Sequence, residues 1–193
     1  MRRTLLPLLA FVVGLVGLCV AAFVVLAPKT QEAGTSSVGG PFTLMNQDGQ
    51  RVTERDYAGR THLVFFGFTH CPDVCPTTLQ QIGDVLQALG PKGRDTRALF
   101  IAVDPKRDTP DALKTYLASF DPRIVGLTGT PEEVAAAVKA YRAYVRKVPT
   151  KEGDYTMEHT ALVYVMNGQN RFLNALNLAR PPAEAAAELA KML

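Results

Sequence analysis

The feature that most restricts how this chain can fold is an alternation of short apolar runs with amphipathic segments. His62–Phe68 (HLVFFGF) is an uninterrupted apolar run, which is typical of a strand buried on both faces of a sheet. The segment after Cys75 carries leucines and an isoleucine at helical spacing, and Ala98–Val103 is a second apolar run. Strands that alternate with helices in this way predict βαβ units and a largely parallel sheet.

The remaining segments extend this pattern at both ends of the domain. Turn chemistry at Asp48-Gly49 predicts an N-terminal hairpin. Apolar periodicity and helix-starting Thr-Pro pairs predict further helices over 109–120, 130–141 and 181–193, and strands over 124–127, 160–166 and 171–176. Together these elements predict an α/β, thioredoxin-like fold, in which a mainly parallel central sheet is flanked by helices.

An apolar segment precedes this domain. Leu5–Ala27 carries no charged side chain and is long enough, as a helix, to cross a hydrocarbon core of ~30 Å. Arg2 and Arg3 come before it, so the positive-inside rule places residues 1–4 in the cytoplasm. A cleaved signal peptide is the alternative, but its apolar region is usually only ~7–15 residues long. We therefore expect a single transmembrane anchor over 5–27, in a bacterial inner membrane, with the rest of the chain in the periplasm.

Residues 28–40 are expected to be a flexible linker, because they are rich in Gly, Ser and Thr and lack apolar periodicity. The folded domain is then expected over 41–193, in a compartment where disulfides can form. The chain has 21 Lys and Arg against 18 Asp and Glu. Without Arg2 and Arg3 this balance is nearly neutral, so the charge does not favour binding of nucleic acid.

Two cysteines stand between the first apolar run and the helix that follows it. In Cys71–Pro76 (CPDVCP), the second proline suits the first position of a helix, which would make Cys75 the N-cap. The free N–H groups and the dipole of a helix start stabilise a thiolate, so we expect a lowered pKa for Cys75. Two such thiols can close a Cys71–Cys75 disulfide, hold a thiophilic metal, or do each in turn.

Two other interpretations of the cysteine pair are less favourable. A permanent structural disulfide does not need a proline after each cysteine at the start of a helix. A peroxidatic thiol is disfavoured because peroxiredoxins carry Thr three residues before the reactive cysteine, whereas Phe68 and Pro72 occupy those positions here.

A metal held by two sulfur atoms needs a further donor, and His159 is the best candidate. It directly precedes a predicted buried strand, in the loop that faces the cysteine-bearing turn of a thioredoxin-like sheet. His70 adjoins Cys71, but its ring is expected to point away from that side chain. His62 begins a strand and is expected to be solvated. Met157 is a weaker thioether candidate that is more simply explained by core packing.

The donor chemistry favours copper. Two thiolates and an imidazole are soft enough for Cu(I) and can also hold Cu(II) or Zn, but structural zinc generally has a fourth ligand, and the affinity order favours copper. We therefore expect one copper ion per chain, in an open site suited to delivery. Asp73, Asp104 and Glu158 are candidate carboxylates around the ligands, although solvated loop residues are the simpler interpretation of each.

Four stretches resemble the Sco/SenC copper proteins, which help to assemble cytochrome c oxidase: Phe65–Pro76, Val103–Pro110, Gly126–Gly129 and Tyr155–His159. The resemblance implies a thioredoxin-like fold, one N-terminal membrane helix, and copper bound by Cys71, Cys75 and His159. In one departure, Glu158 stands where the family usually has Asp, so a longer side chain would have to make any hydrogen bond that orients this loop.

The resemblance also implies a function. Family members are described as metallochaperones for the binuclear copper centre of oxidase subunit II, as thiol reductants of its cysteines, or as both. A thiol–disulfide oxidoreductase and a copper or redox sensor are therefore alternatives for Cys71 and Cys75, and only the first would make the chain an enzyme. The implied partners are oxidase subunit II or another copper-site apoprotein, an upstream periplasmic copper chaperone, and a thioredoxin-like reductant.

Overall fold

The structure is a computed structural model that describes residues 38–151 and 153–193. The predicted anchor over 5–27, and the predicted linker up to residue 37, lie outside the described residues. Within the described ranges, no helix is both long and apolar enough to span a membrane.

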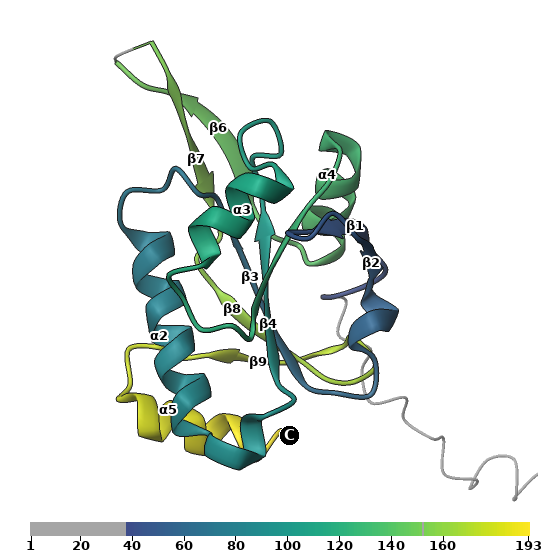
Figure 1. Ribbon diagram of the computed structural model, residues 1–193, viewed down its shortest axis with the longest axis vertical. Coiled ribbons are helices and arrows are strands. Elements are labelled where there is room, and N and C mark those ends of the chain that lie inside the picture. The colour runs from purple at the N-terminus through teal and green to yellow at the C-terminus, as the bar shows by residue number, and fades with distance from the viewer. Residues whose placement is uncertain (1–37, 152) are drawn as a thin grey trace, which may run out of the picture. The chain divides into compact units, whose positions relative to one another are not determined.

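Strands and helices alternate between residues 62 and 140, and the remaining strands follow one another directly (Figure 1). Their bounds are β1 (Thr43–Asn46), β2 (Arg51–Thr53), the 3-10 helix η1 (Glu54–Tyr57), β3 (His62–Gly67), α2 (Val74–Ala88), the 3-10 helix η2 (Gly90–Gly93), β4 (Arg97–Ala102), α3 (Pro110–Leu117), β5 (Ile124–Thr128), α4 (Pro131–Ala140), β6 (Val145–Pro149), β7 (Tyr155–His159), β8 (Val163–Met166), β9 (Phe172–Leu176) and α5 (Pro182–Leu189). The predicted N-terminal hairpin, the two βαβ units and the closing strands are all present.

A seven-stranded sheet in the order β2-β1-β5-β4-β3-β8-β9 forms the centre of the domain. Strands β3, β4 and β5 are parallel, as the βαβ pattern predicts. The pairings of β1 with β5, β1 with β2, β3 with β8, and β8 with β9 are antiparallel. The prediction of a mainly parallel sheet therefore holds only for the three central strands. Short turns make the antiparallel pairs β1–β2 and β8–β9, whereas β1 and β8 join the central strands in antiparallel orientation from distant parts of the sequence.

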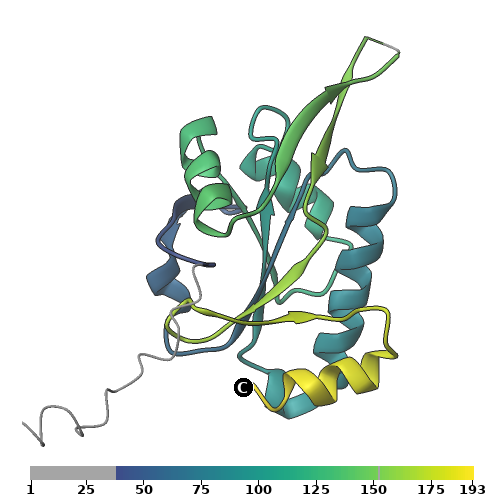
Figure 2. The ribbon, with the colours of Figure 1, turned by 180° about the vertical axis from the view of Figure 1, so that it is seen from behind.

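Helices cover both faces of this sheet (Figures 1 and 2). The two right-handed crossovers place α2 and α3 on one face, where α5 packs against α2, and α4 covers the other face. All residues of β3 are consequently buried. The apolar run from which this strand was predicted is thus explained by its position at the centre of the sandwich.

The β6–β7 hairpin forms a separate two-stranded sheet that projects away from the main sheet (Figure 1). The sequence predicts a loop at Tyr155–His159, and the structure shows a strand instead. The signal was weak because every residue of β6 is exposed or only half-buried, so no apolar run marks the hairpin.

His62 is another point of difference from the sequence prediction. Its side chain is buried and not solvated: Nδ1 lies 3.2 Å from the carbonyl oxygen of Arg60, and Nε2 lies 3.3 Å from Oδ1 of Asn170. Asn170 also accepts a hydrogen bond from the Tyr141 hydroxyl and donates one to the carbonyl of Gly40. The folded domain therefore includes contacts from the end of the predicted linker.

Candidate metal centre

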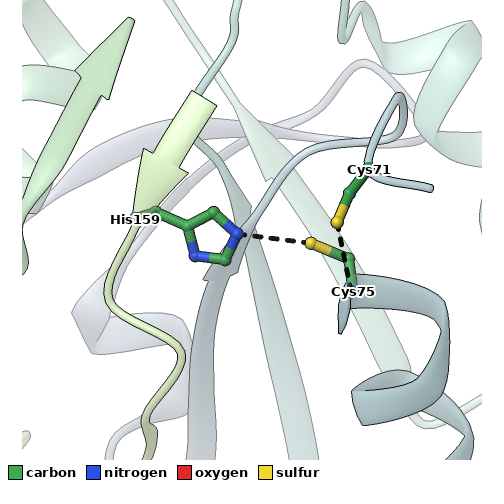
Figure 3. Close-up of side chains that lie close together, drawn as sticks. All are labelled: Cys71, Cys75 and His159. Atoms are coloured by element: carbon green, nitrogen blue, oxygen red, sulfur yellow. Dashed lines mark hydrogen bonds between the residues drawn. The ribbon is translucent and has the colours of Figure 1, made fainter. Parts of the chain in front are cut away.

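Three donor atoms meet at the carboxyl end of β3 (Figure 3). The Sγ atoms of Cys71 and Cys75 and a ring nitrogen of His159 all lie within 4.8 Å of one another. Nε2 of His159 is 3.4 Å from Sγ of Cys75, across 84 positions of sequence. The structure thus brings together the three residues that the sequence analysis singled out, at distances that let one ion contact all of them.

The start of α2 differs from the prediction. The helix begins at Val74 with Asp73 as N-cap, so Cys75 is its second residue and Pro76 its third. Proline is tolerated there because the first four N–H groups of a helix have no partner within it. As a result, it is Sγ of Cys71 that accepts a backbone hydrogen bond at the helix start, from the N–H of Cys75 at 3.3 Å.

The predicted lowering of the Cys75 pKa is wrong. This side chain is fully buried, and burial raises the pKa of its thiol because a thiolate loses its hydration there. A Cβ on Gly67 would lie 3.0 Å from Sγ of Cys75 and 2.5 Å from the ring of Phe100. Only glycine therefore leaves room for this sulfur beneath the end of β3. Both thiols are free, and no disulfide joins Cys71 and Cys75.

His159 is the last residue of β7, and its ring turns toward the sulfur atoms (Figure 3). Its Nδ1 lies 3.1 Å from the carbonyl oxygen of Thr160, which requires the proton on Nδ1 and leaves the lone pair on Nε2. The rings of Phe65 and Phe68 stand edge-on to the imidazole at centroid distances of 6.0 and 5.9 Å. Burial lowers the pKa of His159, so the neutral form that binds metal prevails.

The three candidate carboxylates lie around the site without contacting its donors. Asp73 is exposed and makes no side-chain capping bond. Glu158 pairs with Arg146 at 2.8 Å on the exposed hairpin. Asp104 is buried, but its carboxylate accepts hydrogen bonds from Arg107 and from the hydroxyl of Tyr155.

His70 and Met157 are the two weaker candidate ligands predicted from the sequence. His70 is exposed, with Nδ1 3.0 Å from Oγ1 of Thr69 and no contact to the two sulfurs. Met157 is half-buried and packs against the core, as expected.

Asp108, a fully buried carboxylate near the thiols, is not among the site residues predicted from the sequence. It accepts hydrogen bonds from the backbone N–H of Thr69 at 3.3 Å and from the Thr69 hydroxyl at 2.6 Å, two residues before Cys71. Burial raises the pKa of Asp108. Its place within Val103–Pro110, one of the stretches that carry the family resemblance, was the only signal for it in the sequence.

Comparison with known proteins identifies the family of this chain. Residues 30–193 match the model of the SCO1/SenC family. The chain belongs to this family. The human protein SCO1 homolog, mitochondrial, is 39% identical over 165 residues, which cover 84% of this chain and 55% of the human protein. The chain thus spans about half the length of that mitochondrial relative.

Solved structures of Sco proteins share the fold. Copper-bound ScoI of Bradyrhizobium japonicum is 53% identical, with a TM-score of 0.77, over 81% of this chain and 99% of that one. BsSco, a member of the Sco family of cytochrome c oxidase assembly proteins in which a disulfide switch was identified, is 27% identical, with a TM-score of 0.63, over 80% of this chain and 91% of that one. The predicted thioredoxin-like Sco fold is thereby confirmed.

Proposed function

We propose that this protein is a copper metallochaperone that serves the assembly of the binuclear copper centre of cytochrome c oxidase subunit II. Each chain would hold one copper ion through Sγ of Cys71, Sγ of Cys75 and Nε2 of His159. The observation that carries the proposal is the convergence of these three donors within 4.8 Å. The copper-bound Sco structures support the choice of metal.

The chemistry of the donors suits copper that is carried and released. Thiolate and imidazole are preferred ligands of Cu(I), and the thiols release their protons when the metal binds. The raised pKa of Cys75 makes copper uptake depend on pH, because the ion must displace a tightly held proton. Neutral His159 needs no such step.

The exposure of the site suggests the direction of transfer. Cys75 is buried, whereas Cys71 is half-buried and the residues between the two cysteines are exposed, Val74 by 46%. A thiolate of subunit II, or of another copper-site apoprotein, would therefore approach on the Cys71 side and replace one sulfur at a time. The oxidation state of copper does not change in such an exchange, so no electron donor is required.

The proposal is tested by copper retention in the purified, reduced protein, measured against a chromogenic Cu(I) chelator. We expect one copper ion per chain, and a large loss of affinity in Cys71→Ser, Cys75→Ser and His159→Ala. His70→Ala is the matched control, because this exposed histidine is next to Cys71 in the sequence but its ring contacts Thr69 and Asp108. Unchanged affinity in His159→Ala, with an intact fold, would contradict the ligand assignment.

A second function, thiol–disulfide exchange, is favoured by the free thiols and the short separation of Cys71 from Cys75. The disulfide switch of BsSco is consistent with it. The dithiol would pass two electrons and two protons to a partner disulfide, such as the oxidised copper site of subunit II, and a thioredoxin-like reductant would restore it. In this case His159→Ala should retain exchange with a disulfide peptide, while Cys71→Ser and Cys75→Ser abolish it.

We also propose that 5–27 anchors the protein in the bacterial inner membrane, with residues 1–4 in the cytoplasm and the metal centre in the periplasm. The charge-free segment and the preceding Arg2 and Arg3 support this topology. An upstream periplasmic copper chaperone would then load the site. Protease added to intact spheroplasts should digest the domain; full protection would contradict the topology.

A further inference from the structure

The two halves of the metal centre are connected by a third segment, the turn between β4 and α3, which we call the bracket loop (Asp104–Asp108). Its own backbone is held by hydrogen bonds from the N–H groups of Arg107 and Asp108 to the carbonyl of Asp104, at 3.0 and 2.9 Å. Asp104 and Asp108 are 5% and 0% exposed. The bracket loop is therefore a compact turn with a buried aspartate at each end, while Lys106 at its middle is exposed.

One end of the bracket loop holds the hairpin that carries His159. Asp104 accepts a hydrogen bond from the Tyr155 hydroxyl at 3.1 Å and pairs with Nε of Arg107. Arg107 donates from Nη1 to the backbone carbonyl of Tyr155 at 3.2 Å, and its Cζ lies 3.8 Å from the centroid of the Tyr155 ring. Tyr155 is the first residue of β7 and His159 is the last, so these contacts fix the strand at the end away from the metal donor.

The other end of the bracket loop holds the cysteine-bearing turn. The Asp108 carboxylate accepts two kinds of hydrogen bond from Thr69, from its backbone N–H and from its hydroxyl. Thr69 lies two residues before Cys71. The same five-residue turn thus contacts the segment that positions the thiols and the strand that positions the imidazole.

We propose that Asp104 and Arg107 are positioning residues of the copper centre, which hold β7 so that His159 stays close to the thiols and copper leaves slowly. The inference rests on the proposed function, because it concerns the retention of copper by that site. Residues that orient metal ligands without touching the metal typically change affinity 10–100-fold when they are replaced. Loss of Arg107 removes the hydrogen bond to the Tyr155 carbonyl, the stacking on its ring and the pairing of Asp104 together.

The test uses the full-length protein in detergent, loaded with Cu(I). For Arg107→Ala we expect copper affinity to fall about 10–100-fold, with faster transfer to a chelator. Arg146→Ala is the matched control. It also removes a guanidinium, but this one lies on the β6–β7 hairpin itself and pairs with the exposed Glu158. The copper affinity of this variant should equal that of the unsubstituted protein. Tyr155→Phe, which removes only the hydrogen bond to Asp104, should give a smaller change in the same direction.

Two further measurements separate positioning from a general loss of structure. In a His159→Ala background, Arg107→Ala should cause no additional loss of affinity, because it acts through that histidine. In the copper-free protein, amide hydrogen exchange should become faster in β7 for Arg107→Ala and stay unchanged in β3.

The outcomes also separate this inference from the proposed function. Unchanged affinity and transfer rate in Arg107→Ala, or an equal loss in the His159→Ala background, would overturn the positioning role alone. Failure of the unsubstituted protein to retain copper would overturn both.

Discussion

The three candidate metal donors come from two regions that differ in how they are held. The cysteines follow β3, a strand whose residues are all buried between helices on both faces of the sheet. His159 ends β7, part of a projecting hairpin in which no residue of either strand is fully buried. The thiols are thus positioned by the core. The imidazole is carried by the β6–β7 hairpin, which Asp104 and Arg107 contact at Tyr155.

This difference suits the proposed function, in which copper is first retained and then transferred. Regions with few buried apolar contacts open with a lower free energy than the core. The cysteine pair should therefore keep its geometry throughout a transfer, while the histidine can withdraw when the hairpin moves. The comparison predicts that substitutions in the sheet mainly change stability, and that substitutions on the hairpin mainly change metal binding.

The largest effect on stability is expected from Phe65→Ala. This side chain is 1% exposed, and its ring contacts Phe100 and His159 at centroid distances of 6.0 Å. Removing it should lower the free energy of unfolding by about 3–5 kcal/mol, through lost burial and a residual cavity. Chemical denaturation of the copper-free protein measures this, and a loss below 1 kcal/mol would contradict the rigid role assigned to β3.

A smaller loss is expected from Gly67→Ala, which adds one methyl group at the end of the same strand. The new Cβ would lie 2.5 Å from the ring of Phe100 and 3.0 Å from Sγ of Cys75. Overpacking of this kind typically costs about 1–3 kcal/mol, and here it should also displace a metal donor. Gly59→Ala serves as a control for the loss of a glycine away from the core, although its positive φ adds backbone strain. Denaturation and copper affinity should both change in Gly67→Ala.

His62 is expected to make the stability of the protein depend on pH. This residue begins β3, at the end opposite to Gly67 and the cysteines. Burial lowers the pKa of His62 below its ordinary value of about 6.5. The unfolded chain then binds more protons than the folded protein once the pH falls below about 6.5, so stability should decrease with acidification from that point. His159 acts in the same direction. Replacing His62 by Gln should reduce the slope between pH 7 and 5; an identical slope would exclude this group as its source.

The smallest effect is expected on the hairpin. Nζ of Lys147 lies 3.4 Å from the centroid of the Tyr155 ring, at an exposed position, so Lys147→Ala should cost only about 0.5–1 kcal/mol. Its effect on copper affinity should exceed that of Arg146→Ala, because Arg146 pairs with Glu158 and Lys147 contacts the Tyr155 ring. Equal copper affinities in the two variants would show that contacts to Tyr155 do not matter for the centre.

The parts of the structure that could be predicted are those with a local signal. An apolar run predicts β3 because a strand covered on both faces needs apolar side chains throughout. A threonine N-cap followed by a proline at the first position marks the starts of α3 and α4 directly. The hairpin has no such signal, since its strands are stabilised by a single neighbour and by contacts from the distant bracket loop. The burial of His62 likewise depends on Asn170, which is 108 positions away in the sequence.

The sequence by itself determined the fold class, the cysteine pair at the end of a buried strand, and the choice of His159 as the third donor, because each of these follows from short-range patterns or from recognisable motifs. Only the tertiary structure decided the electrostatics of the site. It assigned the backbone hydrogen bond at the helix start to Cys71 and not to Cys75, buried Cys75 so that its pKa rises, and placed Asp104, Arg107 and Asp108 between the two halves of the centre. The physical reason is that burial and hydrogen-bond partners depend on segments that meet only after the chain has folded.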